Sequence, residues 1–181
     1  MAVIDDVTDA DALAAALGAL QRTGVGGGVG MYVDTDAKNS ARYLVHFTQS
    51  GLGLPDESYY REEQHADVLE AYAGHIARMF ALVLGGDSAD HIQTAERIVA
   101  LETKLAEAHW DVVKRRDADL SYNLRTFAQL RDESVGFDWA TWAAALGTTA
   151  DALAEVVVRQ PDYVRTFAKL WRNEDLEVWK N

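Results

Sequence analysis

Histidines and acids are the residues of this chain that could hold a metal ion or exchange protons. The five histidines are His46, His65, His75, His91 and His109. The zinc-binding helix of many peptidases carries H-E-x-x-H, and no two of these histidines are four residues apart. A carboxylate-bridged di-metal site needs two E-x-x-H pairs, and only Glu62 and His65 form one. We therefore predict no metal site and no catalytic residue in this chain.

The residue spacing also argues against a serine nucleophile and a phosphate-binding loop. No G-x-S-x-G nucleophile elbow occurs. The segment 24–30 holds five glycines, but it matches neither G-x-G-x-x-G nor a phosphate loop that ends in Lys-Ser or Lys-Thr. It also leads toward a strand, whereas a phosphate loop leads into a helix. We expect a flexible or close-packed lead-in to a hairpin.

Charge and composition exclude several partners. The chain has 17 basic and 29 acidic residues, a net charge of −12, which disfavours binding to nucleic acid or anionic lipid. No apolar run approaches the ~20 residues of a membrane span, and no signal-peptide pattern is present. Without cysteine, disulfides and thiolate metal sites are excluded. We predict neither a nucleic-acid nor a membrane partner.

A basic cluster, Lys114-Arg115-Arg116, stands just before Asp117 and Asp119. Cations are favourable at a helix C-terminus, so one interpretation is a capped and neutralised corner in which these acids pair with the cluster. The other is an anion-binding site.

The elements that must position these residues are mostly helical. Met31–Val33 and Tyr43–Phe47 favour strands, and the polar insert 34–40 predicts a hairpin with a longer than minimal loop. In 51–55 two glycines and a proline predict a bend. The segment 154–159 fits either a brief strand or the end of a helix.

Apolar spacing predicts the helices. We expect one from Thr8, as N-cap, to Arg22, and an antiparallel pair over 62–84 and 87 to about 113. Shorter helices are expected over 126–131, 138–146, from Pro161, and over 174–179. Trp139 and Trp142 are expected in the core. Glu102 and Glu107 are expected on a solvated face, with Lys104 paired to Glu107. The predicted fold class is mainly α, a helical domain with one β-hairpin near the N-terminal third.

Two blocks of the sequence resemble a known family. The first is D-x-D-x-K-N-S followed by L-G-L-P-x-x-x-Y-Y, and the second runs from L-E-T-K-L-A to R-D and Y-N. The matching positions are Asp34, Asp36, Lys38, Asn39, Leu52, Gly53, Leu54, Pro55, Tyr59, Tyr60, Arg116, Asp117, Tyr122 and Asn123. Together they resemble the N-terminal, non-catalytic region of the neprilysin family of zinc metallopeptidases, which includes the endothelin-converting-enzyme-like members.

The resemblance implies that residues 1–181 are a fragment of the helical cap domain of a zinc metalloendopeptidase. Its zinc catalytic domain is expected beyond Asn181, so zinc would be a cofactor of the parent and not of this chain. The segment would pack on that domain, help enclose the substrate chamber and restrict peptide size, and would be inactive alone. The matching residues receive a structural role. The lack of cysteine departs from the disulfide-linked animal enzymes and indicates a bacterial branch, with a cytoplasmic or secreted parent.

The alternative is a free-standing helical binding or scaffold module without catalytic activity. A module predicts a closed apolar surface and a native end near Asn181. A fragment predicts an exposed apolar face where the catalytic domain docks, with possible self-association of the isolated chain. The apparent end of the chain inside a helix favours the fragment.

Overall fold

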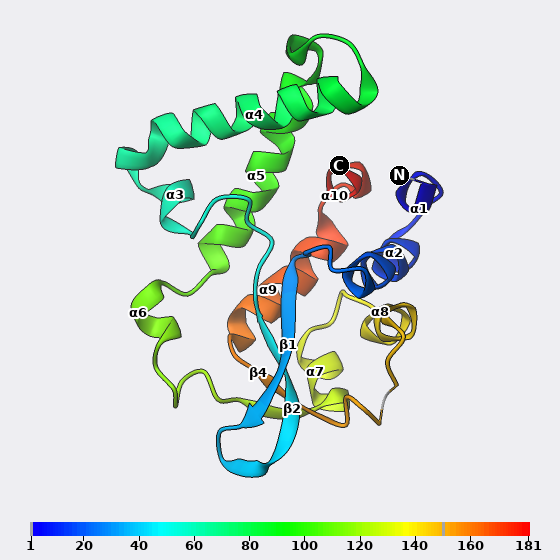
Figure 1. Cartoon of the computed structure of the whole chain (residues 1–181), viewed down its shortest axis with the longest axis vertical. Coiled ribbons are helices and arrows are strands. Elements are labelled where there is room, and N and C mark those ends of the chain that lie inside the picture. The colour runs from blue at the N-terminus through cyan, green and yellow to red at the C-terminus, as the bar shows by residue number, and fades with distance from the viewer. Residues whose placement is uncertain (1, 150) are drawn as a thin grey trace.

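The computed structural model describes residues 2–149 and 151–181 and shows a small mixed sheet surrounded by helices (Figure 1). The strands are β1 (Val29–Asp36), β2 (Asn39–Gln49), β3 (Leu124–Thr126) and β4 (Glu155–Val158). The longer helices are α2 (Ala10–Arg22), α4 (Ala66–Leu84), α5 (Ile92–Ala108) and α9 (Pro161–Asn173). The shorter ones are α1 (Ala2–Asp5), α3 (Ser58–Arg61), α6 (Val112–Arg115), α7 (Phe127–Glu133), α8 (Trp139–Leu146) and α10 (Leu176–Lys180), with 3-10 turns η1 (Glu63–His65) and η2 (Ser88–His91). The predicted mainly α fold with an N-terminal hairpin is confirmed.

The hairpin belongs to a four-stranded sheet of order β1-β2-β4-β3. The β1–β2 and β3–β4 pairs are antiparallel, whereas β2 and β4 are parallel. The segment 154–159, which the sequence left open between strand and helix end, therefore supplies a strand. Its partner β3 was not expected, because three residues leave too short a pattern to recognise.

The hairpin loop is shorter than predicted. Asp36 pairs with Asn39, so only Ala37 and Lys38 connect the strands, next to a register shift at Thr35–Asp36. The reason is local: the Asp36 carboxylate accepts from the Lys38 backbone N–H at 2.9 Å. This side-chain bond closes a tight turn that polar composition alone suggested to be an open loop.

One face of the sheet packs on the aromatic core. Phe47 is fully buried and meets Trp139 and Trp142 with ring centroids 5.3 and 5.8 Å apart. These two tryptophans from α8 confirm the predicted core anchor. Side chains alternate along a strand, so His46 lies on the opposite face, where it stacks on Tyr32. Val112, Arg115 and Arg116 lie over that second face, because they line a pocket together with Tyr32 and Thr48.

The helices α4 and α5 do not form the predicted antiparallel pair. Their directions differ by 110° across the break between them, and Figure 1 shows α4 lying across the end of α5. Gly85 and Gly86 both have φ near +85°, and Asp87 then starts η2 with a capping box to Asp90. This turn sends the chain obliquely away from α4.

The helix α5 ends at Ala108, earlier than the predicted position near Val113. His109 leaves the helix in an extended conformation, with φ −67° and ψ 143°. The backbone N–H of the next residue, Trp110, donates to Gln49 Oε1 at 2.8 Å, and its C=O accepts from Gln49 Nε2 at 2.9 Å. These two long-range bonds replace the helical ones, so α6 is a separate short helix.

Helix ends mostly follow local capping. Asp138 caps α8, Gly147 ends it with φ +84°, and Pro161 occupies the first turn of α9, all as predicted. At the N-terminus the prediction was wrong by one residue, because Asp9 and not Thr8 accepts the Ala12 N–H that starts α2. The last helix is capped by Asp175 and begins at Leu176.

Candidate functional site

The loop after β2 is held by a network centred on Tyr60 and Glu102. The Tyr60 hydroxyl accepts from the backbone N–H groups of Gly53 and Leu54, both at 3.1 Å. It donates to Glu102 at 2.5 Å, and the Tyr72 hydroxyl donates to the other carboxylate oxygen at 3.0 Å. The loop, α3, α4 and α5 therefore meet at one carboxylate.

This network corrects the prediction for Glu102, which is partly buried and accepts three donors. Lys104 likewise pairs with Glu174, at 2.7 Å, and not with Glu107. Burial raises the pKa of both Tyr60 and Tyr72 most, and the hydrogen bond to Glu102 and the charge of that carboxylate raise it further. Both hydroxyls therefore remain protonated donors at neutral pH, which suits positioning and not nucleophilic attack.

A second network closes the hairpin turn. Asp36 is 1% exposed and accepts from Lys38 N–H, the Arg42 guanidinium and the Tyr122 hydroxyl. The Lys38 bond, with those of Tyr122 and Arg42, lowers the pKa of Asp36 to about 2. Arg42 extends the network to Glu155 on β4. The two sequence blocks, far apart in the chain, thus meet at Asp36 and Tyr122.

The other matching residues make local contacts. The Lys38 ammonium lies 4.6 Å from the centroid of the Tyr122 ring. Asp34 accepts from Thr35 N–H, Asn39 from Ala41 N–H, and Asp117 from Asp119 and Leu120 N–H. Asn123 donates to the Leu120 carbonyl. Leu52 packs against the core, Pro55 is exposed, and Tyr59 stacks on His65.

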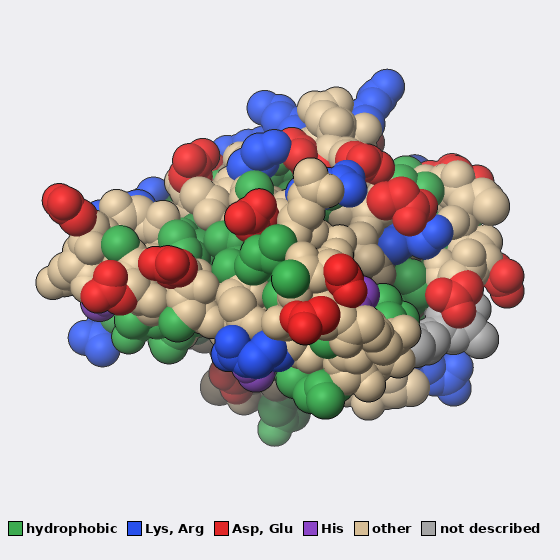
Figure 2. Space-filling view, turned by 90° about the horizontal axis from the view of Figure 1, so that it is seen from above, with side chains coloured by type: hydrophobic (Ala, Val, Ile, Leu, Met, Phe, Trp, Pro, Cys, Tyr) green, Lys and Arg blue, Asp and Glu red, His purple; other side chains and the backbone are tan. Residues whose placement is uncertain are grey.

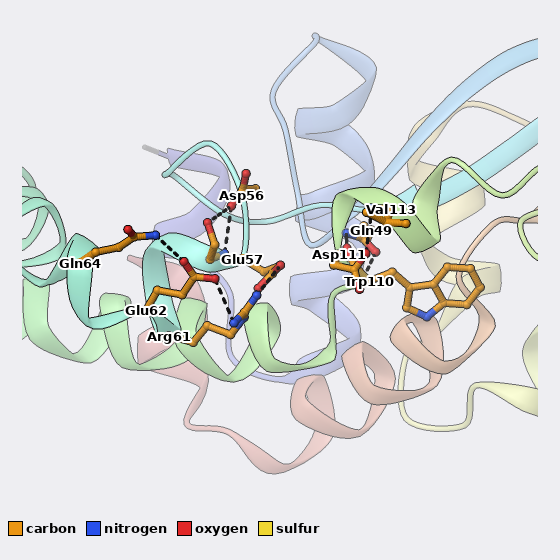
Figure 3. Close-up of polar contacts among 10 residues, drawn as sticks. Gln49, Asp56, Glu57, Arg61, Glu62, Gln64, Trp110, Asp111 and Val113 are labelled. Atoms are coloured by element: carbon orange, nitrogen blue, oxygen red, sulfur yellow. Dashed lines mark hydrogen bonds and ion pairs between the residues drawn. The ribbon is translucent and has the colours of Figure 1, made fainter.

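Figure 3 shows how the loop continues into α3. Asp56 accepts from the backbone and hydroxyl of Ser58, and Arg61 pairs with both Glu57 and Glu62. The same view shows Gln49 reaching the Trp110 backbone. Each acid near the loop is thus engaged by a neighbour.

A pocket of about 390 Å³ lies where this loop meets α5. Its walls are Gly26–Gly28, 50–53, the α5 residues Ile98, Leu101, Glu102 and Leu105, and the C-terminal Val178, Trp179 and Asn181. Glu102 is the single acid in this lining, and it is already bonded to two tyrosines. The lining holds no pair of groups for acid–base catalysis.

The five histidines lie apart. His46 is buried on the sheet, His65 stacks on Tyr59, and His75 is exposed on α4. The Nε2 atoms of His91 and His109 contact the carbonyls of Gly85 and Ser50. Within residues 2–149 and 151–181, no three His, Cys, Asp or Glu side chains are grouped to hold a metal ion.

A search of the described helices finds none that could cross a membrane by itself. One bent pair, Glu63–Leu84 with Ser88–Ala108, has sufficient combined length and hydropathy.

Comparison with known protein families identifies the family of this chain. Residues 1–181 match the family described as Peptidase family M13. The chain therefore belongs to peptidase family M13, in agreement with the neprilysin-like resemblance of its motifs.

Individual relatives sharpen the assignment. The Mycobacterium tuberculosis zinc metalloprotease Zmp1, solved with an inhibitor, is 72% identical, with a TM-score of 0.97 over 99% of this chain and 27% of that chain. Endothelin-converting enzyme 1 of Cavia porcellus is 36% identical over 60% of this chain and 15% of its own length. PepO from Lactobacillus rhamnosis, at 18% identity and a TM-score of 0.71, shares the fold. This chain thus corresponds to a minor part of each relative.

Sequence reasoning missed the partners that complete both networks. Tyr72, Arg42 and Glu155 have no local pattern that marks them, because their partners lie far along the chain. Glu102 carried a signal, since it lies inside the second matching block beside Leu101. Because Glu102 lies in a block that matches the family, a buried hydrogen-bond acceptor was an alternative to the predicted solvated face.

Proposed function

We propose that this chain is the non-catalytic helical part of a zinc-dependent metalloendopeptidase. The parent would hold zinc and hydrolyse peptides with residues outside this chain. This part would pack on the catalytic domain, help enclose the substrate chamber and limit the size of the peptides that enter. The observation that carries the proposal is the near-complete match of the chain to one segment, 27% in extent, of a zinc metalloprotease.

An exposed apolar face supports docking to the rest of the parent. On α4 Val68 is 41% exposed, Met79 47%, Leu82 80% and Val83 58%. Met79 and Leu82 lie close to whole helical turns from Val68, so they share a face with it. Figure 2, which views the α4 end, shows hydrophobic side chains between charged ones. Such an area on a monomer usually marks an interface.

The size limit can be tested in the full-length protein by replacing Leu82 and Val83 with serine. Each buried Leu or Val at an interface contributes about 1.5–3 kcal/mol, so the double variant should loosen the docked domain. We expect the rate on a long unfolded substrate, relative to a short quenched peptide, to rise about tenfold or more, equivalent to ~1.4 kcal/mol.

The matched control is Val135→Ser, which also replaces an exposed valine, 65% accessible, but lies between α7 and α8. It should leave the ratio unchanged. A double variant that folds normally and keeps the wild-type ratio of long to short substrate would refute the chamber role.

A further inference from the structure

A second pocket, of about 430 Å³, lies between the outer face of the sheet and α6. Its lining is Tyr32, Thr48, Val112, Arg115, Arg116, Arg159 and Gln160. Three arginines thus line one pocket, and no carboxylate is in the lining. In a chain of net charge −12, such a site is a local concentration of positive charge that the composition does not suggest.

These arginines are not neutralised by neighbours. Within the described part of the chain, Arg42, Arg61, Arg97 and Arg125 each pair with an acid. Arg159 instead donates to two neutral groups, the hydroxyls of Tyr32 at 3.1 Å and Ser121 at 3.3 Å. Arg115 and Arg116 form no ion pair with a described residue, so the predicted pairing of the basic cluster with Asp117 and Asp119 is not found.

The polar side chains around the arginines leave donors available. Gln160 is 1% exposed, and its Oε1 accepts from the Thr48 hydroxyl and from Gln49 N–H. Its Nε2 donates to none of the described residues. Tyr32 is held by stacking on His46 at 5.1 Å between ring centroids. Burial, with the charge of Arg159, lowers the pKa of His46, so this histidine adds no charge at neutral pH.

A neighbouring pocket shows the contrast. It measures about 370 Å³ and is lined by Glu107, Asp111 and Asp162 together with Lys114. Lys114 lies 3.6 Å from Asp162 and 3.9 Å from the centroid of the Trp110 ring. That pocket combines three carboxylates with one ammonium, whereas the pocket beside Arg159 holds cations and no carboxylate.

We propose that the pocket of Arg115, Arg116 and Arg159 is an oxyanion-binding site. Guanidinium groups bind planar carboxylates and phosphates through paired charge-assisted hydrogen bonds, and the Gln160 amide adds a neutral donor. The ligand is a carboxylate or phosphate group, either free in solution or carried by the acidic side chains of a peptide. The site goes beyond the proposed size limit, because it selects ligands by charge.

The test is isothermal titration calorimetry on the full-length protein, with zinc removed by a chelator so that no anion is held by the metal. The probes are inorganic phosphate and two matched peptides, acetyl-Glu-Glu-Glu-amide and acetyl-Gln-Gln-Gln-amide. We expect saturable binding of phosphate, of the acidic peptide, or of both, and none of the neutral peptide. Phosphate alone indicates a free anion, and the acidic peptide alone indicates a peptide carboxylate.

Arg115→Gln is the first variant, because the Arg115 side chain is exposed and bonds to no described residue, so folding should be unaffected. It should weaken binding about tenfold, and Arg115→Gln with Arg159→Gln about a hundredfold. Arg165→Gln removes the same charge from an exposed position of α9 outside the pocket and should change binding less than twofold. Absence of saturable binding to the wild type, or equal binding by Arg115→Gln and wild type, would overturn the site.

Discussion

At the scale of single residues, the Tyr60 hydroxyl links the loop after β2 to α5 through three hydrogen bonds. It accepts two backbone N–H groups of the loop and donates to Glu102. A phenylalanine would keep the ring packing but leave these three groups without that partner. Since an unsatisfied buried polar group costs about 1–3 kcal/mol, loss of this hydroxyl should weaken the attachment of the loop to α5, where Gly53 N–H keeps its direct bond to Glu102 at 3.3 Å.

We therefore predict that Tyr60→Phe lowers the free energy of unfolding by about 1–3 kcal/mol. The neighbouring Tyr59→Phe is the control, because the Tyr59 ring stacks on His65 and its hydroxyl bonds to no described residue. That variant should stay within about 0.5 kcal/mol of the wild type. Urea unfolding of both variants checks the prediction, and equal losses would contradict it.

A second residue-scale prediction concerns acid pH. Burial is the main cause that lowers the pKa of His109 from 6.5 to about 4. Below pH 6.5 the unfolded chain therefore takes up a proton that the folded chain does not, so stability falls as the pH drops toward 4. The loss reaches about 3 kcal/mol at most, and His46 adds to it with the same sign.

The measurement is the free energy of unfolding at pH 7 and at pH 4.5 for the wild type and for His109→Gln. Glutamine does not titrate in this range, so the variant should show a clearly smaller difference between the two pH values. The remainder would belong to His46 and to the carboxylates. An unchanged difference would show that His109 is not the group responsible.

At the scale of elements, Gln49 ties the end of β2 to the segment after α5. Both bonds of its side chain go to the buried backbone of Trp110. We predict that Gln49→Ala destabilises the protein by about 2–4 kcal/mol, because two backbone groups lose their partner. It should also displace α6 and speed trypsin cleavage after Arg115 and Arg116. Gln64→Ala, at an exposed position bonded only to Glu62, should do neither.

Local sequence patterns predicted the helices and strands better than the contacts and angles between them. Asp138, Gly147 and Pro161 set helix ends by nearby chemistry, and the hairpin followed from strand propensity. The end of α5 at Ala108, the oblique angle of α4 and the burial of Glu102 depend on partners far along the chain. No local pattern contains them. For the same reason the basic cluster was recognised, but the pocket that Arg115 shares with Arg159 was not.

At the scale of the whole molecule, the chain combines a buried aromatic core with an apolar helix face that is exposed to solvent. The aromatic cluster around Phe47 and Trp139 is buried, whereas α4 presents Leu82 and Val83 to solvent. Both sequence blocks serve to hold the loop and the turn in place, and neither brings catalytic groups together among the described residues. This arrangement supports the proposal that the chain positions and encloses, and that the chemistry belongs to other residues of the parent.

The most direct test of that claim compares the full-length protein with the 181-residue chain, prepared in the same way. Zinc content is measured by mass spectrometry, and hydrolysis is followed with a short quenched peptide. The account predicts about one zinc per full-length molecule, with activity abolished by a chelator, and neither bound zinc nor hydrolysis for the chain alone. Stoichiometric zinc on the isolated chain, or chelator-sensitive hydrolysis by it, would contradict the account.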